Sequence, residues 1–214
     1  MPYPQHRIDS LQAYFDGGFH EIRRECEREA IEIIARLDRD LYEQGIDGSI
    51  AEIGVLHGAS FIGMQHLTEP GTKCLAIDVF DIPDYEMDPT GNGGGRASKA
   101  AFTESLTRWG RLEDAVLCEA DSLALDQWLL EPFRGRIKIF SIDGMHTKQH
   151  TLADLWTAFC MVMPGGIICV DDYGHAAWPL VKEGADEFIE RTNQWVTRVD
   201  AAHNKLYLRK GNVA

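Results

Sequence analysis

Acidic and histidine side chains follow two apolar runs of the chain, where buried strands would end: Asp143 and His146 follow one run, and Asp171 and Asp172 follow the next. If these strands are neighbours, three carboxylates meet at one sheet edge, where their repulsion favours a hard divalent cation. Carboxylates with few His or Cys suit Mg²⁺, Mn²⁺ or Ca²⁺ better than Zn²⁺. His146 would stand beside the cation as a candidate general base. Alternatively, Asp171 and Asp172 only end a strand and cap the next helix.

Glycine and polar residues surround the end of an earlier apolar run, in the sequence Glu52-Ile53-Gly54-Val55-Leu56-His57-Gly58-Ala59-Ser60. The two glycines permit a tight strand-to-helix turn and close approach of a ligand to the backbone, although the spacing is not G-x-G-x-x-G and also fits a plain turn. The next run ends at Asp78, 20 residues past Gly58. A carboxylate there accepts hydrogen bonds from both hydroxyls of a ribose, whereas the alternative is a cap for the following loop. The glycines upstream favour the ribose interpretation.

Asp121 and Ser122 follow a third apolar run. An acceptor side chain followed by a free backbone N–H at a strand end recognises the edge of an adenine. A cap for the next helix fits the same two residues equally well.

The elements that must position these residues are short apolar runs separated by helical patterns. Such alternation predicts an α/β fold, a doubly wound, Rossmann-like, seven-stranded and mostly parallel sheet, because parallel strands are buried on both faces. In such a sheet, ligands bind beyond the carboxyl ends of the strands. A short polar link between the last two runs predicts an antiparallel C-terminal hairpin. The runs are Ile50–Leu56, Cys74–Phe80, Ala115–Cys118, Ile137–Ile142, Ile167–Val170, Trp195–Val199 and Lys205–Leu208.

Two segments depart from this alternation. Residues 1–48 form an N-terminal helical extension, since apolar residues recur at helical spacing from Glu21 to Tyr42; this helix would cover a core face or an interface between copies of the chain. Residues 81–98 hold four glycines, two prolines and four acidic residues in 18 positions. A loop of this length predicts a mobile lid or a solvated insertion.

Composition limits the class of protein. The 214 residues include 34 Asp and Glu against 21 Lys and Arg, a formal charge of −13. This balance argues against non-specific binding to nucleic acid or to an anionic membrane. No apolar run reaches the roughly 18 residues of a membrane span, and the first residues lack a signal-peptide pattern, which predicts a cytoplasmic protein. The five cysteines are widely spaced and predicted to be buried thiols in a reducing compartment.

The glycine segment with Asp78, Asp121 and Ser122 resembles the S-adenosylmethionine (SAM) site of class I methyltransferases. The sequences Ile142-Asp143-Gly144-Met145-His146 and Pro164-Gly165-Gly166, followed by Val170-Asp171-Asp172-Tyr173, narrow the resemblance. They are similar to metal-dependent O-methyltransferases of antibiotic biosynthesis, namely the macrocin, mycinamicin and novobiocin-pathway enzymes and the cephalosporin hydroxylase/rhamnosyl O-methyltransferase group. The resemblance extends from Ser49 to Tyr173, which identifies residues 49–214 as the methyltransferase domain.

The resemblance implies a role for each matching residue. His146 would be the base, and Asp143 would share in catalysis by holding the cation beside the substrate. Mg²⁺, or alternatively Mn²⁺, would be held by Asp143, Asp171 and Asp172. The methionine end of SAM would contact Glu52, Gly54, Gly58 and Ser60, the ribose Asp78, and the adenine Asp121 and Ser122.

The resemblance therefore implies SAM-dependent transfer of a methyl group to a hydroxyl of a small molecule, such as a sugar, another vicinal diol or a natural product. Three alternatives stay open: a methyltransferase without metal, a nicotinamide-dependent oxidoreductase, and a non-catalytic SAM-binding subunit of a biosynthetic complex. No nucleic-acid or membrane partner is expected, and the Glu21–Tyr42 helix is a candidate interface for a homo-oligomer.

Overall fold

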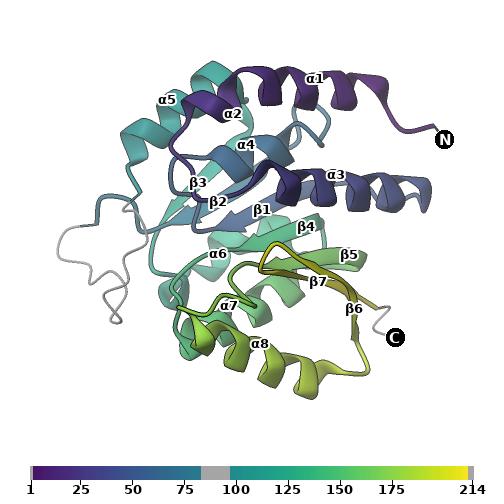
Figure 1. Ribbon diagram of the computed structural model, residues 1–214, viewed down its shortest axis with the longest axis vertical. Coiled ribbons are helices and arrows are strands. Elements are labelled where there is room, and N and C mark those ends of the chain that lie inside the picture. Colours follow the sequence, from purple (N-terminus) through teal and green to yellow (C-terminus); the bar gives the residue numbers. More distant parts are fainter. Residues whose placement is uncertain (1, 83–96, 212–214) are drawn as a thin grey trace.

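The computed structural model describes residues 2–82 and 97–211, in which seven strands form one sheet. The order across the sheet is β3-β2-β1-β4-β5-β7-β6 (Figure 1). The strands are β1 (Ser49–Ile53), β2 (Cys74–Asp78), β3 (Ala115–Glu119), β4 (Ile137–Ile142), β5 (Val162–Val170), β6 (Val196–Ala202) and β7 (Lys205–Lys210).

The first five strands are parallel and the last two form an antiparallel hairpin. His203 and Asn204 make the hairpin turn with φ of 52° and 59°, the two positive φ angles that characterise a type I′ turn. The predicted seven-stranded α/β fold is thus confirmed.

Helices cover both faces of the sheet (Figure 1). One face packs against the N-terminal helices together with α4 and α5, and the other against α7 and α8, which gives two apolar cores. The central strands β1, β2 and β4 are buried at nearly every position, which requires this double cover. The helices are α1 (Gln5–Asp16), α2 (Gly18–Glu21), α3 (Arg28–Glu43), α4 (Ala59–Gln65), α5 (Lys99–Trp109), α6 (Gln127–Leu130), α7 (Lys148–Met161) and α8 (Pro179–Thr192).

The helix predicted from Glu21 begins only at Arg28, because the chain is extended at Ile22 and leaves the helical path after α2. Ile22 is nevertheless buried, and Cys26 packs against the same core. The two apolar side chains therefore continue the helical spacing without belonging to a helix. Helix α3 itself buries one face against the sheet, which is one of the two roles predicted for it.

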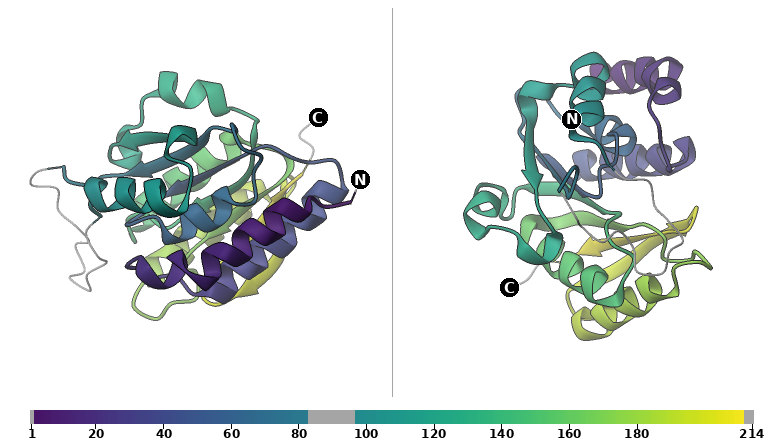
Figure 2. Two further views of the ribbon diagram at one scale, coloured as in Figure 1. Left: turned by 90° about the horizontal axis from the view of Figure 1, so that it is seen from above. Right: turned by 90° about the vertical axis from the view of Figure 1, so that its left-hand side faces the viewer.

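Buried charges connect the N-terminal helices to the sheet. Arg7 of α1 and Lys138 of β4 are fully buried, and both contact Asp47 and Asp38. Helices α1 and α3 lie side by side (Figure 2), and Arg7 of α1 pairs with Asp38 of α3 between them. Because removing one partner of a buried ion pair leaves an uncompensated charge, costing about 3–5 kcal/mol, the network fixes the N-terminal helices on the sheet.

Two further expectations concern segments between elements. Strand β5 begins at Val162, earlier than the predicted run, because the Pro164-Gly165-Gly166 segment lies within the strand, beside a register shift against β4. Residues 83–96 of the predicted 81–98 loop are not among the described residues.

Among the helices described, none is long and apolar enough to cross a membrane.

Candidate active site

The candidate site lies at the carboxyl ends of β1 and β4, where the strand order reverses direction. This is the place where open parallel sheets bind ligands. The Asp143 N–H donates to the carbonyl of Ile53 at 2.8 Å, so the segment after β4 continues alongside the end of β1. A Cβ atom on Gly54 would lie 1.7 Å from the Asp143 carbonyl oxygen, and Gly54 has a φ of 83°. The close approach of the Asp143 carbonyl therefore requires glycine at position 54.

A cavity opens at this point, and five of the seven predicted cofactor residues line it: Glu52, Gly54, Ser60, Asp78 and Ser122. Glu52 is buried, and its Oε2 atom has no hydrogen-bond partner among the described residues. Burial raises the pKa of Glu52 to about 8, although the hydroxyls of Ser60 and Ser141 oppose the shift. An ammonium group entering the cavity would satisfy this orphaned oxygen.

Asp78 lies across the cavity at the end of β2, and the backbone holds its carboxylate. Its Oδ2 accepts from the Leu56 N–H and its Oδ1 from the Phe80 N–H, both at 3.0 Å. Burial raises the pKa of Asp78, while the backbone N–H groups oppose this. Because each carboxylate oxygen has two lone pairs, the fixed carboxylate can still accept hydrogen bonds from ligand hydroxyls.

Gly58 and Asp121 do not line the cavity. Gly58 precedes α4 with a φ of 93°, and a Cβ atom there would lie 3.0 Å from the Phe102 ring. The Asp121 carboxylate accepts from the Leu123 N–H at 2.9 Å and lies 3.3 Å from Nε2 of His150. Both residues shape the cavity wall through the neighbours that they position.

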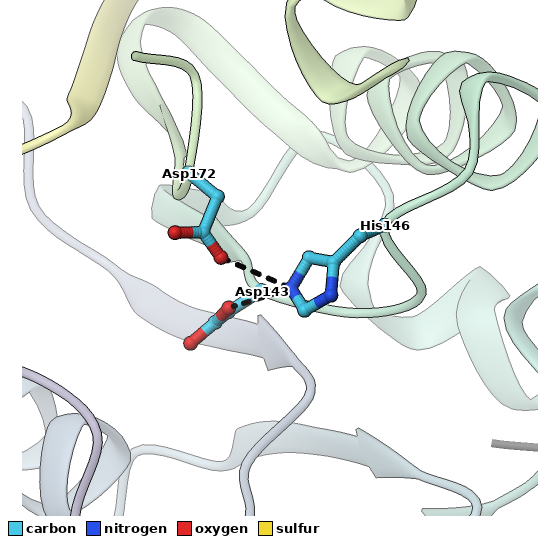
Figure 3. A group of neighbouring side chains, drawn as sticks. All are labelled: Asp143, His146 and Asp172. Atoms are coloured by element: carbon cyan, nitrogen blue, oxygen red, sulfur yellow. Dashed lines mark ion pairs between the residues drawn. The ribbon is translucent and has the colours of Figure 1, made fainter. Parts of the chain in front are cut away.

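Three of the predicted catalytic and metal residues converge beside Glu52. Asp143, His146 and Asp172 each present an atom able to bind a metal, and these atoms lie within 4.8 Å of one another. Nε2 of His146 lies 3.0 Å from Asp172 Oδ2 and 3.9 Å from Asp143 Oδ1 (Figure 3). The two carboxylates are hard oxygen donors that fit a cation such as Mg²⁺ or Mn²⁺, and the imidazole stands beside them.

The His146 ring has fixed surroundings. It stacks on the Trp178 ring with centroids 4.1 Å apart and an interplanar angle of 25°. Burial lowers the pKa of His146, but the nearby carboxylates of Asp143 and Asp172 outweigh this and raise the pKa to about 9. The imidazole therefore carries a proton at neutral pH and acts as a counter-cation to the two carboxylates.

Asp171 has different partners from Asp172. One of its oxygens pairs with the Nζ atom of Lys205, and the other accepts from the Asp172 N–H at 2.8 Å. Burial raises the pKa of Asp171 to about 6, and the Asp143 charge adds to this while Lys205 opposes it. The structure thus brings Asp143 and Asp172 together with His146, and Asp171 together with Lys205.

Sequence reasoning missed three features of the site. The segment Arg23–Cys26 lines the cavity. Asp154 of α7 is buried behind Ser122 with both oxygens unpartnered among the described residues. Lys205 stands at the start of a strand run, and only the antiparallel pairing of β7 with β5 brings it to the site.

The comparisons with known proteins agree with this geometry. The sequence pattern of a methyltransferase-domain family matches residues 51–173, the part of the chain that contains the cavity and the acidic cluster. The chain belongs to this family and is a class I SAM-dependent methyltransferase. No match was found among curated proteins.

Solved structures show the same fold at low sequence identity. The O-methyltransferase NovP is 17% identical, with a TM-score of 0.65 over 86% of this chain and 80% of NovP. An O-methyltransferase from Bacillus cereus in complex with SAH is 15% identical, with a TM-score of 0.59 over 99% of this chain and 93% of that one. TomG from Streptomyces achromogenes, involved in tomaymycin synthesis and solved with SAM, is 13% identical, with a TM-score of 0.59 over 98% and 91%.

Proposed function

We propose that this chain is an O-methyltransferase that transfers the methyl group of SAM to a hydroxyl oxygen of a small molecule, assisted by a divalent cation. The observation that carries the proposal is the convergence of Asp143, His146 and Asp172 beside the orphaned carboxylate of Glu52. Three structures of the same fold, NovP, TomG and the Bacillus cereus protein, are named as O-methyltransferases, which supports the class of acceptor.

Binding of SAM would use the residues that line the cavity. Glu52 would accept hydrogen bonds from the methionine ammonium, with Gly54 and Ser60 beside it, because its Oε2 is buried without a partner. Asp78 would bind the ribose hydroxyls, and Ser122 the adenine edge. Gly58 and Asp121 would contribute indirectly, by holding the start of α4 and the turn before Ser122.

Asp143 and Asp172 would hold the cation, with Mg²⁺ favoured and Mn²⁺ as the alternative. A divalent ion there supplies positive charge that lowers the pKa of the acceptor hydroxyl. His146 would take the hydroxyl proton at Nε2, because the charges that raise its pKa to about 9 are the two carboxylates that a cation neutralises. The Trp178 ring keeps the imidazole oriented for this transfer.

The acceptor would be a small molecule with two adjacent oxygens, such as a sugar, another vicinal diol or a natural-product hydroxyl. The cavity reaches from the residues assigned to SAM to Asp143 and His146, so an acceptor bound beside the acidic cluster would lie next to the methyl donor. The segment Arg23–Cys26 forms the wall nearest the N-terminal helices and would contact the acceptor.

A chelator titration with an Asp143→Asn variant tests this proposal. Methyl transfer to a panel of diols should stop with EDTA and return with Mg²⁺ or Mn²⁺, and the variant should lose activity while still binding SAH in calorimetry. Full turnover in EDTA would leave a methyltransferase without metal. SAH binding without turnover on any acceptor would instead indicate a SAM-binding subunit.

A further inference from the structure

The carboxyl ends of β1, β4 and β5 gather four carboxyl groups close to one another, those of Glu52, Asp143, Asp171 and Asp172. Such a group is unfavourable unless positive charge or protons compensate it. His146 faces Asp143 and Asp172. The remaining positive charge comes from Lys205, whose side chain is only 7% exposed.

The topology explains how a lysine reaches this edge. Parallel strands present their carboxyl ends there, so a residue at the start of a strand arrives only from an antiparallel partner. Strand β7 runs antiparallel to β5, with Leu206 opposite Val170, and Lys205 therefore lies opposite Asp171. A second contact joins the same segments, because the Gly174 N–H donates to the Asn204 carbonyl at 3.3 Å.

Asp171 connects Lys205 to the candidate metal ligands. One carboxylate oxygen pairs with Lys205 Nζ, and the other accepts from the Asp172 N–H. Asp172 has a φ of 55°, a left-handed conformation that a residue other than glycine adopts at some energetic cost. This conformation turns the Asp172 side chain toward His146 and Asp143, as Figure 3 shows, while Asp171 is held on Lys205.

We propose that Lys205 and Asp171 form a fixed positioning pair beside the cation site, and that Asp171 is not itself a metal ligand. The pair holds the Asp172 backbone in its left-handed turn and cancels the charge of Asp171. The cation then meets two carboxylates, those of Asp143 and Asp172, rather than three. This inference rests on the proposed function, because it assigns the residues around the cation of that site.

A double-mutant cycle on Mn²⁺ affinity separates a positioning pair from a ligand, and it does not depend on turnover. Asp171→Asn keeps the acceptor for the Asp172 N–H but leaves the Lys205 charge uncompensated, which should weaken Mn²⁺ binding about tenfold. The double variant Lys205→Met with Asp171→Asn removes both charges. It should bind Mn²⁺ within about threefold of the wild type, since the pair contributes no net charge.

The double variant is also expected to fold. Replacing a buried ion pair by neutral groups of similar size is often tolerated, whereas Lys205→Met alone leaves a buried unpaired carboxylate. Thermal melts should confirm that the double variant and Asp171→Asn are folded. Asp38→Asn is a matched control, because Asp38 forms another buried pair, with Lys138, away from the cluster, and its Mn²⁺ affinity should equal that of the wild type.

If Asp171 is a ligand, Lys205→Met will not rescue Asp171→Asn, and the double variant will stay at least about tenfold weaker than the wild type. That result overturns the inference and leaves the proposed metal site intact. If wild type and Asp143→Asn bind Mn²⁺ equally, no cation site exists at the cluster, and the metal-assisted function itself fails.

Discussion

Nε2 of His146 lies 3.0 Å from Oδ2 of Asp172, although the two residues follow different strands. The ring is held there by stacking on Trp178, and its Nε2 also lies 3.9 Å from Oδ1 of Asp143. One nitrogen thus points at the carboxylates that would hold a cation, which is where a base must stand to act on an oxygen bound to that cation.

Replacing the imidazole should therefore remove proton transfer and spare binding. We expect His146→Ala to lower kcat by about 10²–10⁴, the usual contribution of a general base. The variant should retain SAH affinity in calorimetry and Mn²⁺ affinity in a direct titration. His6→Ala, which removes an exposed imidazole, is the control and should have wild-type kcat. Loss of Mn²⁺ binding in His146→Ala would make His146 a ligand rather than the base.

The sheet was predictable because its signal is local. Strands β1, β2 and β4, and residues 166–170 of β5, are buried at nearly every position, which produces apolar runs in the sequence. Polar residues that end such runs gather at one edge of a parallel sheet, so the approach of Asp143 to the Asp171-Asp172 pair was predictable once the two strands were taken as neighbours.

The partners within the site were less predictable, because they depend on side-chain direction. Asp171 and Asp172 are identical neighbours, and only the left-handed backbone at Asp172 decides which of them faces His146. Lys205 resembles a surface residue before a strand, and its burial depends on the pairing of β7 with β5. The spacing of Ile22 and Cys26 likewise predicts a helix that is not there. Both side chains reach the core from a non-helical segment before α3.

Glu52 provides a test of cofactor binding that involves no metal. Because burial raises the pKa of Glu52 to about 8, its carboxyl is mostly protonated at pH 7 before the ligand arrives. The positively charged ammonium group of SAH favours the ionised form of the Glu52 carboxyl. SAH binding should therefore release about one proton in the wild type. Glu52→Gln should release none and bind SAH about 10–100-fold more weakly.

Calorimetry in two buffers of different ionisation enthalpy measures both quantities. Glu131→Gln makes the same chemical change at an exposed residue paired with Arg134, and it should behave as the wild type. Equal proton release by Glu52→Gln and wild type would show that Glu52 does not meet the ammonium.

A substitution at Gly54 tests how closely the segments after β1 and β4 approach each other. An alanine Cβ there would lie 1.7 Å from the Asp143 carbonyl oxygen, so the backbone of one segment has to move. Alanine would also be strained by the positive φ at this position. We expect the clash and the strain together to lower the free energy of unfolding of Gly54→Ala by about 2–5 kcal/mol. Gly71 has a φ of 88° with nothing within 4 Å of its would-be Cβ, and Gly71→Ala should cost only about 1–2 kcal/mol. Equal losses in urea unfolding would show that the contact with Asp143 can relax.

Asp154 links burial to a pH dependence of stability. Burial raises its pKa from 3.8 to about 7, with the nearby Asp121 charge adding to the shift and Ser122 opposing it. The folded state therefore binds a proton that the unfolded state has released, and stability falls as pH rises from about 4 to 7. Asp154→Asn has no such proton to lose, so its stability relative to the wild type should increase across this range and level off above it. By pH 8 the free energy of unfolding of Asp154→Asn relative to the wild type should have risen by on the order of a few kcal/mol from its value near pH 4. Thermal melts from pH 5 to 8 measure it, and a constant difference between the two proteins would mean that the Asp154 carboxyl is ionised throughout and compensated within the fold.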